Sequence, residues 1–213
     1  MIRLILLSLL IFALYLLVLG SHSTGLAFTV HSFSRVIYIL FISTSLKSHF
    51  FIKKYGIYRG FDTFRKYAKI IMNNDAFTFG ILCFVSRNSF MVPNLELLRT
   101  LGILLIVIGG LIKFWAAILL KDGYYWIDFF IPNSKMSRCL KGPYRLLNNP
   151  MYTIGYLPAY GIAICLYSWP GLLAACIDQF LILAFNYKIE VPHYREVFKN
   201  NFALTSGVHD LGG

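Results

Sequence analysis

Long apolar runs recur along this chain, and they constrain its fold more than any other feature. The runs follow one another closely and cover residues 4–19, 26–46, 70–91, 97–120, 151–169 and 172–187. A helix needs about 20 mainly apolar residues to cross the ~30 Å hydrocarbon core of a bilayer. The pattern therefore predicts an all-α fold, a polytopic integral membrane bundle of about six spans.

The composition indicates the same environment. Hydrophobic residues make up 58% of the 213 residues, charged residues make up 14%, and the mean hydropathy is +0.66. A soluble domain carries roughly 25% charged residues, so a surface this poor in charge is suited to lipid. We expect a single membrane domain over residues 1–213, embedded in a lipid bilayer.

The basic residues are unevenly placed. The net charge is +11, and most of the 20 Lys and Arg residues fall in segments 47–69 and 121–150 and near the two termini. Cytoplasmic loops of membrane proteins collect Lys and Arg. We therefore expect no nucleic-acid partner, with the basic loops and both termini cytosolic. The membrane would be the endoplasmic reticulum in a eukaryote or the inner membrane in a bacterium. Run 4–19 is either a retained span or a signal peptide.

Ionisable residues inside the apolar runs raise two readings that stay open. Arg35, Lys113 and Asp178 lie within predicted spans, where charged groups are rare and commonly functional. The alternative is snorkelling or a buried pair such as Lys113 with Asp178. The four cysteines have no C-x-x-C spacing, so we predict neither a disulfide framework nor a metal site.

A polar segment rich in Gly, Pro and Asn, residues 142–155, precedes the last two apolar runs. These runs are joined at Pro170, and we expect them to form a helical hairpin in the bilayer. The hairpin would return Glu190, which follows its second helix, to the membrane face that holds Asn149 and Tyr152. The two polar motifs are therefore predicted to meet.

These motifs carry a resemblance to a known family. The pattern G-x-Y-x-x-x-x-N-P-M-Y-x-x-G, an apolar hairpin and then a glutamate resembles the integral-membrane methyltransferases that act on phosphatidylethanolamine or isoprenylcysteine. The match is closer to the phospholipid enzymes. It rests on Asn149-Pro150-Met151-Tyr152, on Tyr125-Trp126-Ile127-Asp128-Phe129-Phe130, and on Glu190-x-Pro192-His193.

The resemblance implies a set of site residues. It assigns binding of S-adenosylmethionine to Asn149, Pro150, Tyr152, Gly155 and Glu190, and, in the preceding span, to Gly109 and Gly110. The chain lacks an arginine that many members have just before the proline, and it has Ile189 where several have a second glutamate. These departures affect how the carboxylate and amine of the cofactor are held. Arg145, about one turn earlier, is a candidate to replace the missing arginine.

The chemistry of amine methylation suggests further candidates. An alkyl amine is mainly protonated near neutral pH, so a proton acceptor at headgroup level is useful. The candidate acceptors are Glu190, His193 and Asp128. The residues expected to contact the phospholipid substrate, in part through cation-π contacts, are Tyr125, Trp126, Asp128 and Tyr144. An aromatic belt at the membrane surface is the alternative reading of the 124–130 segment.

The expected function is methylation of phosphatidylethanolamine, or of its partly methylated derivatives, towards phosphatidylcholine. Residues 1–95 would supply N-terminal spans and a basic interfacial segment, 96–200 the methyltransferase-like core, and 201–213 a cytosolic tail. Carboxyl methylation of a prenylated cysteine, a sterol-reductase-like NADPH reductase and a membrane scaffold are the alternatives. A homo-oligomer is possible, and the sequence does not decide it.

Overall fold

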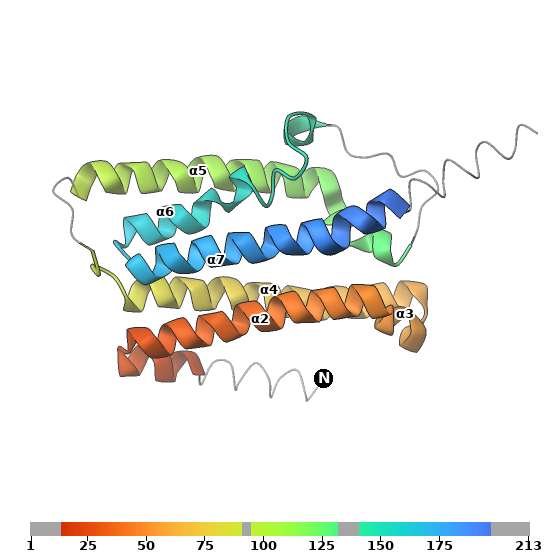
Figure 1. Ribbon diagram of the computed structural model, residues 1–213, viewed down its shortest axis with the longest axis horizontal. Helices are drawn as coiled ribbons and strands as arrows, with labels where there is room; N and C mark the ends of the chain where they lie inside the picture. Colours follow the sequence, from red (N-terminus) through yellow and green to blue (C-terminus); the bar gives the residue numbers. More distant parts are fainter. Residues whose placement is uncertain (1–13, 91–94, 132–140, 197–213) are drawn as a thin grey trace, which may run out of the picture.

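A computed structural model describes residues 14–90, 95–131 and 141–196 of the chain, and no strand occurs in these ranges. The predicted all-α membrane bundle is thereby confirmed. Its helices are α2 (Thr24–Ser48), α3 (Phe50–Tyr55), α4 (Ile57–Val85), α5 (Leu95–Leu120), α6 (Leu157–Cys165) and α7 (Trp169–Phe185). The long helices run lengthwise and side by side (Figure 1).

Four helical stretches in the described part are long and apolar enough to cross a membrane. They are Thr24–Ser48, Ile57–Val85, Glu96–Phe129 and Trp169–Glu196. The predicted span 4–19 lies mainly outside the described residues. The predicted span 151–169 is shorter than expected: it contains the nine-residue helix α6, preceded by a turn of 3-10 helix, η4 (Ile154–Tyr156). Pro150 and Gly155 bracket a turn that delays the start of this helix.

The basic aromatic segment is helical rather than an isolated surface element. Helix α3 ends at Gly56, which has a positive φ of 76°, and α4 begins directly after it. The first turns of α4 are anchored because Phe61 and Phe64 are buried in the core. The predicted span 70–91 is therefore the second part of a longer helix of 29 residues.

Helix α5 contacts α6 closely and exposes most of its remaining surface. A Cβ atom built at Gly161 would lie 2.5 Å from the Gly102 carbonyl oxygen, and one at Gly109 would lie 2.5 Å from Cδ of Pro158. Small residues thus let the two helices approach, as is common between membrane helices. In the most apolar part of the α5 stretch, only 11% of the residues are buried. Its Leu and Ile side chains are therefore free to contact lipid.

The polar segments collect at one end of the bundle. Helix α3 and the start of α4, the end of α5 and the end of α7 lie together on the right in Figure 1. The same end contains an aromatic core in which Phe64 contacts Phe130 and Trp126, with ring centroids 5.0 and 6.3 Å apart. This core fixes the position of the residues that surround the candidate site.

Candidate functional site

The two predicted motifs meet at Glu190. The Tyr152 hydroxyl donates a hydrogen bond of 2.9 Å to Oε1 of Glu190, across 38 residues of sequence. Nε1 of Trp126 and Nδ2 of Asn186 donate to the same carboxylate, and the Glu190 residue is only 5% exposed. The predicted convergence of loop and helix end is confirmed, and it produces a buried carboxylate with three donors.

The local backbone explains how Glu190 and Trp126 come together. Helix α7 continues into a π-helical turn, η5 (Asn186–Glu190), which places Asn186 and Glu190 side by side. After α5, a 3-10 helix, η1 (Lys121–Tyr125), ends at Trp126, whose φ is positive at 56°. That conformation turns the chain, and the buried indole lies edge-on against Phe185 with centroids 5.8 Å apart.

The loop before α6 is held by its own hydrogen bonds. Oδ1 of Asn149 accepts from the Tyr152 N–H at 3.3 Å, and the Asn149 carbonyl accepts from the Thr153 hydroxyl at 2.9 Å. The Gly155 N–H donates to the Pro150 carbonyl at 2.7 Å. A Cβ atom at position 155 would lie 2.9 Å from that same oxygen, so the turn requires glycine. Asn149 and Pro150 therefore shape the loop that presents Tyr152.

The tyrosine at the centre of the loop is itself fixed. Nε2 of Gln179 in α7 donates to the Tyr152 carbonyl at 3.1 Å. Tyr152 lies outside the membrane-spanning helices, and burial together with the nearby Glu190 carboxylate raises the pKa of its phenol well above the usual range. The hydroxyl is therefore a proton donor at every physiological pH.

A cavity of about 380 Å³ lies beside this cluster, lined by residues of α2, α4, α5, α6 and α7, of the loop and of the segment after α5. Two groups of residues singled out in the sequence line it. They are the predicted site residues Tyr125, Trp126, Tyr152 and Gly155, and the ionisable residues of the spans, Arg35, Lys113 and Asp178. Its volume falls within the range of small-molecule sites, roughly 300–1,000 Å³. The aromatic residues singled out in the sequence thus line an internal cavity, which an aromatic belt would not do.

Other predicted residues lie away from the cavity. Oδ2 of Asp128 accepts from the Tyr194 hydroxyl at 3.2 Å, and the Asp128 carbonyl lies 3.4 Å from Nε2 of His193. The His193 ring stacks on Phe129 with centroids 3.6 Å apart. These contacts join the end of α7 to the segment after α5. Neither side chain lines the cavity. The roles of Asp128 and His193 as proton acceptors stay predictions.

The remaining predicted site residues are Gly109, Gly110, Tyr144 and Arg145. Gly109 packs against α6, whereas a Cβ at Gly110 would meet nothing within 4 Å. Tyr144 and Arg145 belong to a short 3-10 helix, η3 (Gly142–Arg145), where Arg145 is exposed. None of these four lines the cavity. Their assignment to the cofactor or the substrate stays a prediction.

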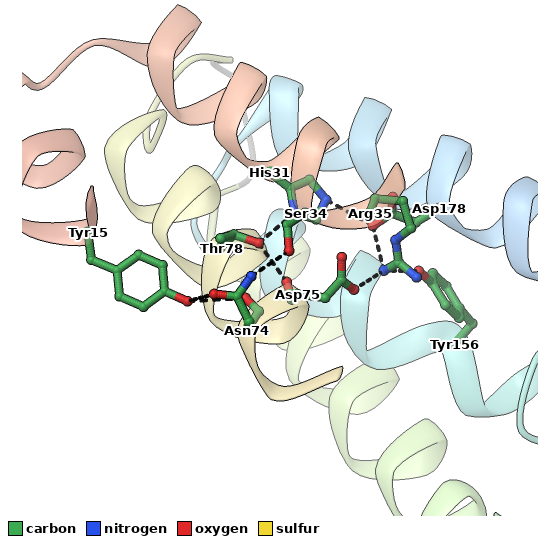
Figure 2. A network of polar contacts seen from close by, with 9 residues as sticks. All are labelled: Tyr15, His31, Ser34, Arg35, Asn74, Asp75, Thr78, Tyr156 and Asp178. Atoms are coloured by element: carbon green, nitrogen blue, oxygen red, sulfur yellow. Dashed lines mark hydrogen bonds and ion pairs between the residues drawn. The ribbon is translucent and has the colours of Figure 1, made fainter. Parts of the chain in front are cut away.

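The structure adds a polar cluster of which the sequence reasoning had singled out only Arg35 and Asp178 (Figure 2). Nη2 of Arg35 lies 2.6 Å from Oδ2 of Asp75 and 2.9 Å from Oδ2 of Asp178. His31 bridges Thr78 and Asp178, with Nδ1 3.1 Å from the hydroxyl and Nε2 2.9 Å from the carboxylate. The pairing of Lys113 with Asp178 that was considered from sequence is absent, because Asp178 is bound to Arg35 and His31.

This cluster belongs to the same cavity. Arg35, Asp75 and Asp178 line it, together with Lys69 and Lys113. In the sequence, Asp75 follows two asparagines at the edge of a weak apolar run, and this position does not indicate that its side chain is buried. The signal that was available is Arg35 itself: a guanidinium in the middle of a span requires carboxylates on neighbouring helices.

Comparison with known proteins identifies the family that this chain is similar to. Residues 97–201 match the family model described as phospholipid methyltransferase. A phosphatidylethanolamine N-methyltransferase of Komagataella phaffii is 29% identical over 140 residues, which is 63% of this chain and 16% of that protein. The protein of the same name from Debaryomyces hansenii is 28% identical over 170 residues, 74% of this chain and 19% of that protein.

The chain thus spans less than a fifth of the length of these curated relatives. No solved structure matches it. The matched segment contains Trp126, the loop with Tyr152, and Glu190, which are the residues that converge beside the cavity. Residues 97–201 of the chain thus match the phospholipid methyltransferase family.

Proposed function

We propose that this protein transfers a methyl group from S-adenosylmethionine to the amine of phosphatidylethanolamine or of its partly methylated derivatives. The observation that carries the proposal is the convergence of Tyr152, Trp126 and Glu190 beside a cavity large enough for a small ligand. The match to the phospholipid methyltransferase family and the similarity to phosphatidylethanolamine N-methyltransferases support the same reaction class.

The cavity residues fit a cationic cofactor. Aromatic faces attract cations, with a contribution of about 0.5–2 kcal/mol per contact, and Tyr125, Trp126 and Tyr152 line the cavity. The buried Glu190 carboxylate adds negative charge directly behind Trp126 and Tyr152. When bound, S-adenosylmethionine would supply an electrophilic methyl group on a sulfonium centre. The chain would hold and orient that group, and the closely packed helices around the cavity would exclude water.

The cavity residues also fit a phospholipid headgroup. Lys69 lines the cavity with its ammonium group 5.3 Å from the Tyr125 ring centroid, and Lys113 lines it from α5. A headgroup phosphate is an anion that a lysine ammonium binds well. We infer that these two lysines face the phosphate, while the acyl chains lie along the lipid-exposed surface of the bundle.

We further propose that the site faces the cytosolic leaflet. Helix α3, the start of α4 and the end of α5 lie at one end of the bundle (Figure 1), and the hydrogen bond to Glu190 ties Tyr152 to the segment at the end of α7. This end is rich in Lys and Arg, in accord with the positive-inside tendency. Placement in the endoplasmic reticulum of a eukaryote or the inner membrane of a bacterium follows from the same expectation.

The alternative substrates fit the cavity less well. The cavity wall carries both signs of charge, with Asp75 and Asp178 beside Arg35, Lys69 and Lys113. The carboxylate of a prenylated cysteine and the phosphates of NADPH are anions only, so they would leave the two wall carboxylates without a matching cation. A lipid amine is positively charged before reaction and is therefore attracted by the same two carboxylates.

The direct test is incorporation of labelled methyl groups. The purified protein in phosphatidylethanolamine vesicles is incubated with S-adenosylmethionine that carries a labelled methyl group, and lipids are identified by mass. We expect labelled mono- and dimethylated phosphatidylethanolamine, and we expect S-adenosylhomocysteine but not NADPH to bind. Label in an added prenylcysteine but not in the lipid would contradict the proposal, as would the absence of label from both.

A further inference from the structure

We propose that Asp75 of α4 receives the amine of the substrate and accepts its proton before methyl transfer. The inference rests on the proposed function and extends it to a residue outside the matched segment 97–201. Asp75 is 5% exposed and lines the cavity next to Arg35. It comes from the N-terminal half of the bundle, opposite the loop that carries Tyr152.

The two oxygens of Asp75 are in different situations. Oδ2 is bound to Nη2 of Arg35 at 2.6 Å. Oδ1 is buried and has no hydrogen-bond partner in the part of the chain that the structure describes. A buried acceptor without a donor costs roughly 1–3 kcal/mol, so folded proteins seldom leave one. An ammonium N–H of a ligand in the cavity would supply the missing donor.

The charge of the cluster also favours a cation. Arg35 is the one guanidinium that contacts both Asp75 and Asp178 (Figure 2). A single guanidinium is thus shared by two carboxylates, and Lys113, which lines the same cavity, forms no ion pair with either of them. Buried ions require compensation, and a protonated amine between the aromatic walls provides it. Tyr38 and Tyr156, which also line the cavity, add polarisable faces and hydroxyl groups to this wall.

The other acidic residues near the site are committed elsewhere. Glu190 accepts from three donors and does not line the cavity. Asp128 is bound to Tyr194 and lies outside the cavity as well. Asp178 lines the cavity, but its Oδ2 is shared between Arg35 and His31. Among the described carboxylates that line the cavity, Asp75 has the buried oxygen without a hydrogen-bond partner.

The distance along α4 suits a headgroup with two charged ends. Lys69 lies six residues before Asp75 on this helix, roughly 9 Å along its axis at 1.5 Å per residue, and both residues line the cavity. A lysine–phosphate contact, the two-carbon bridge of ethanolamine and an amine–carboxylate contact together cover such a distance. Helix α4 would thus bind both ends of the headgroup, with the phosphate at Lys69 and the nitrogen at Asp75.

The proposed step balances as follows. One N–H proton of the substrate ammonium moves to Oδ1 of Asp75, which leaves a lone pair on nitrogen. Nitrogen then forms a bond to the methyl carbon as the carbon–sulfur bond breaks, and that electron pair remains on sulfur. The product nitrogen is again positively charged and carries one more methyl group. Arg35 is a positioning residue here, since it binds Oδ2 and leaves Oδ1 directed away from it.

The experiment compares Asp75→Asn with Asp62→Asn, the same substitution on an exposed aspartate of the same helix. Asp62 is bound to Arg65 at 2.8 Å on the surface. We expect Asp75→Asn to lower kcat roughly 100-fold or more at pH 7, as is typical for loss of a general base. The deficit should shrink as pH rises, because bulk solvent then deprotonates the amine. Asp62→Asn should match the wild type at each pH.

The readout is the ratio of variant to wild-type rate at each pH. The charged and titratable groups around Asp75 are Arg35, His31 and Tyr38 of α2, Lys113 of α5, Asp178 of α7 and Tyr156 of η4. All of them are present in both proteins, so the ratio reports on Asp75. Binding of S-adenosylhomocysteine, measured in parallel, should stay within about twofold of wild type.

A deficit of the same size at every pH, with cofactor binding retained, would overturn the inference and leave Asp75 a structural partner of Arg35. If Asp75→Asn does not fold, Asp75→Glu decides the matter: it keeps the charge and moves the oxygen. We expect a raised KM for phosphatidylethanolamine and a lowered kcat in that variant, whereas wild-type values would refute the proposal. Inactivity of the wild-type protein towards any lipid amine would refute the proposed function itself.

Discussion

Replacing Tyr152 with phenylalanine removes one oxygen atom from the junction between the loop and α7. The aromatic ring that lines the cavity stays, and the lost contact is the 2.9 Å hydrogen bond to Glu190. Hydrogen bonds to charged groups contribute about 1.5–3 kcal/mol. If that contact holds the loop in its reactive position, the substitution lowers kcat/KM roughly tenfold to 150-fold, at 1.4 kcal/mol for each factor of ten.

The matched control is Tyr160→Phe. The Tyr160 hydroxyl donates to Oε1 of Gln179 at 2.7 Å, and the residue does not line the cavity. Both variants lose one tyrosine hydroxyl and one hydrogen bond. Methyl transfer into phosphatidylethanolamine vesicles is measured at limiting S-adenosylmethionine, with thermal unfolding as a check on the fold. Equal rates in the two variants would refute the reasoning, because the Tyr152 contact would then be no more than a packing interaction.

Three further outcomes follow from the structure. Glu190→Ala should lower methyl transfer at least about tenfold without preventing membrane insertion, and wild-type turnover at limiting cofactor would contradict the site. Gly109→Ala should destabilise the protein by about 1–3 kcal/mol, because the new Cβ would lie 2.5 Å from Cδ of Pro158. The measurement is the Tm in detergent, which should fall. The control is Gly110→Ala, whose Cβ would meet nothing within 4 Å and should leave the Tm unchanged. Arg35→Met should destabilise the protein by about 3–5 kcal/mol, since it leaves Asp75 and Asp178 without their cation. Arg65→Met breaks ion pairs at the surface and should change the Tm little. An equal change in Tm in both variants would contradict the role given to the cluster.

The sequence was sufficient for the architecture because lipid imposes a simple requirement. A spanning helix needs a continuous apolar run, and such runs are visible at α2, α5 and α7. The start of α4 was missed, since Lys and Arg obscure the phenylalanines that pack inward. The length of α6 was overestimated, because hydropathy does not show that the turn at Gly155 uses residues of the apolar run.

The site was predictable only where local motifs and the hairpin determine it. Tyr152 and Glu190 meet because a hairpin returns the chain to its starting face. The turn predicted at Pro170 lies slightly earlier, at Leu166, Tyr167 and Ser168, and Pro170 itself belongs to the first turn of α7. The contacts of Asp75 with Arg35 depend on how α2 and α4 pack, which no local pattern encodes. Asp128 and His193 carry plausible chemistry in the sequence, but their side chains are directed towards each other's segments and away from the cavity.

The wall of the cavity has two separate origins along the chain. Trp126, Tyr152 and Gly155 come from the segment shared with the family, whereas Arg35 and Asp75 come from α2 and α4, which precede it. Under the proposed function, the methyl donor would be held mainly by the shared segment, and the amine would be received by Asp75 in the helices before it. A protein that kept the shared segment and exchanged its first helices would then retain the methyl source and turn it towards a different nucleophile.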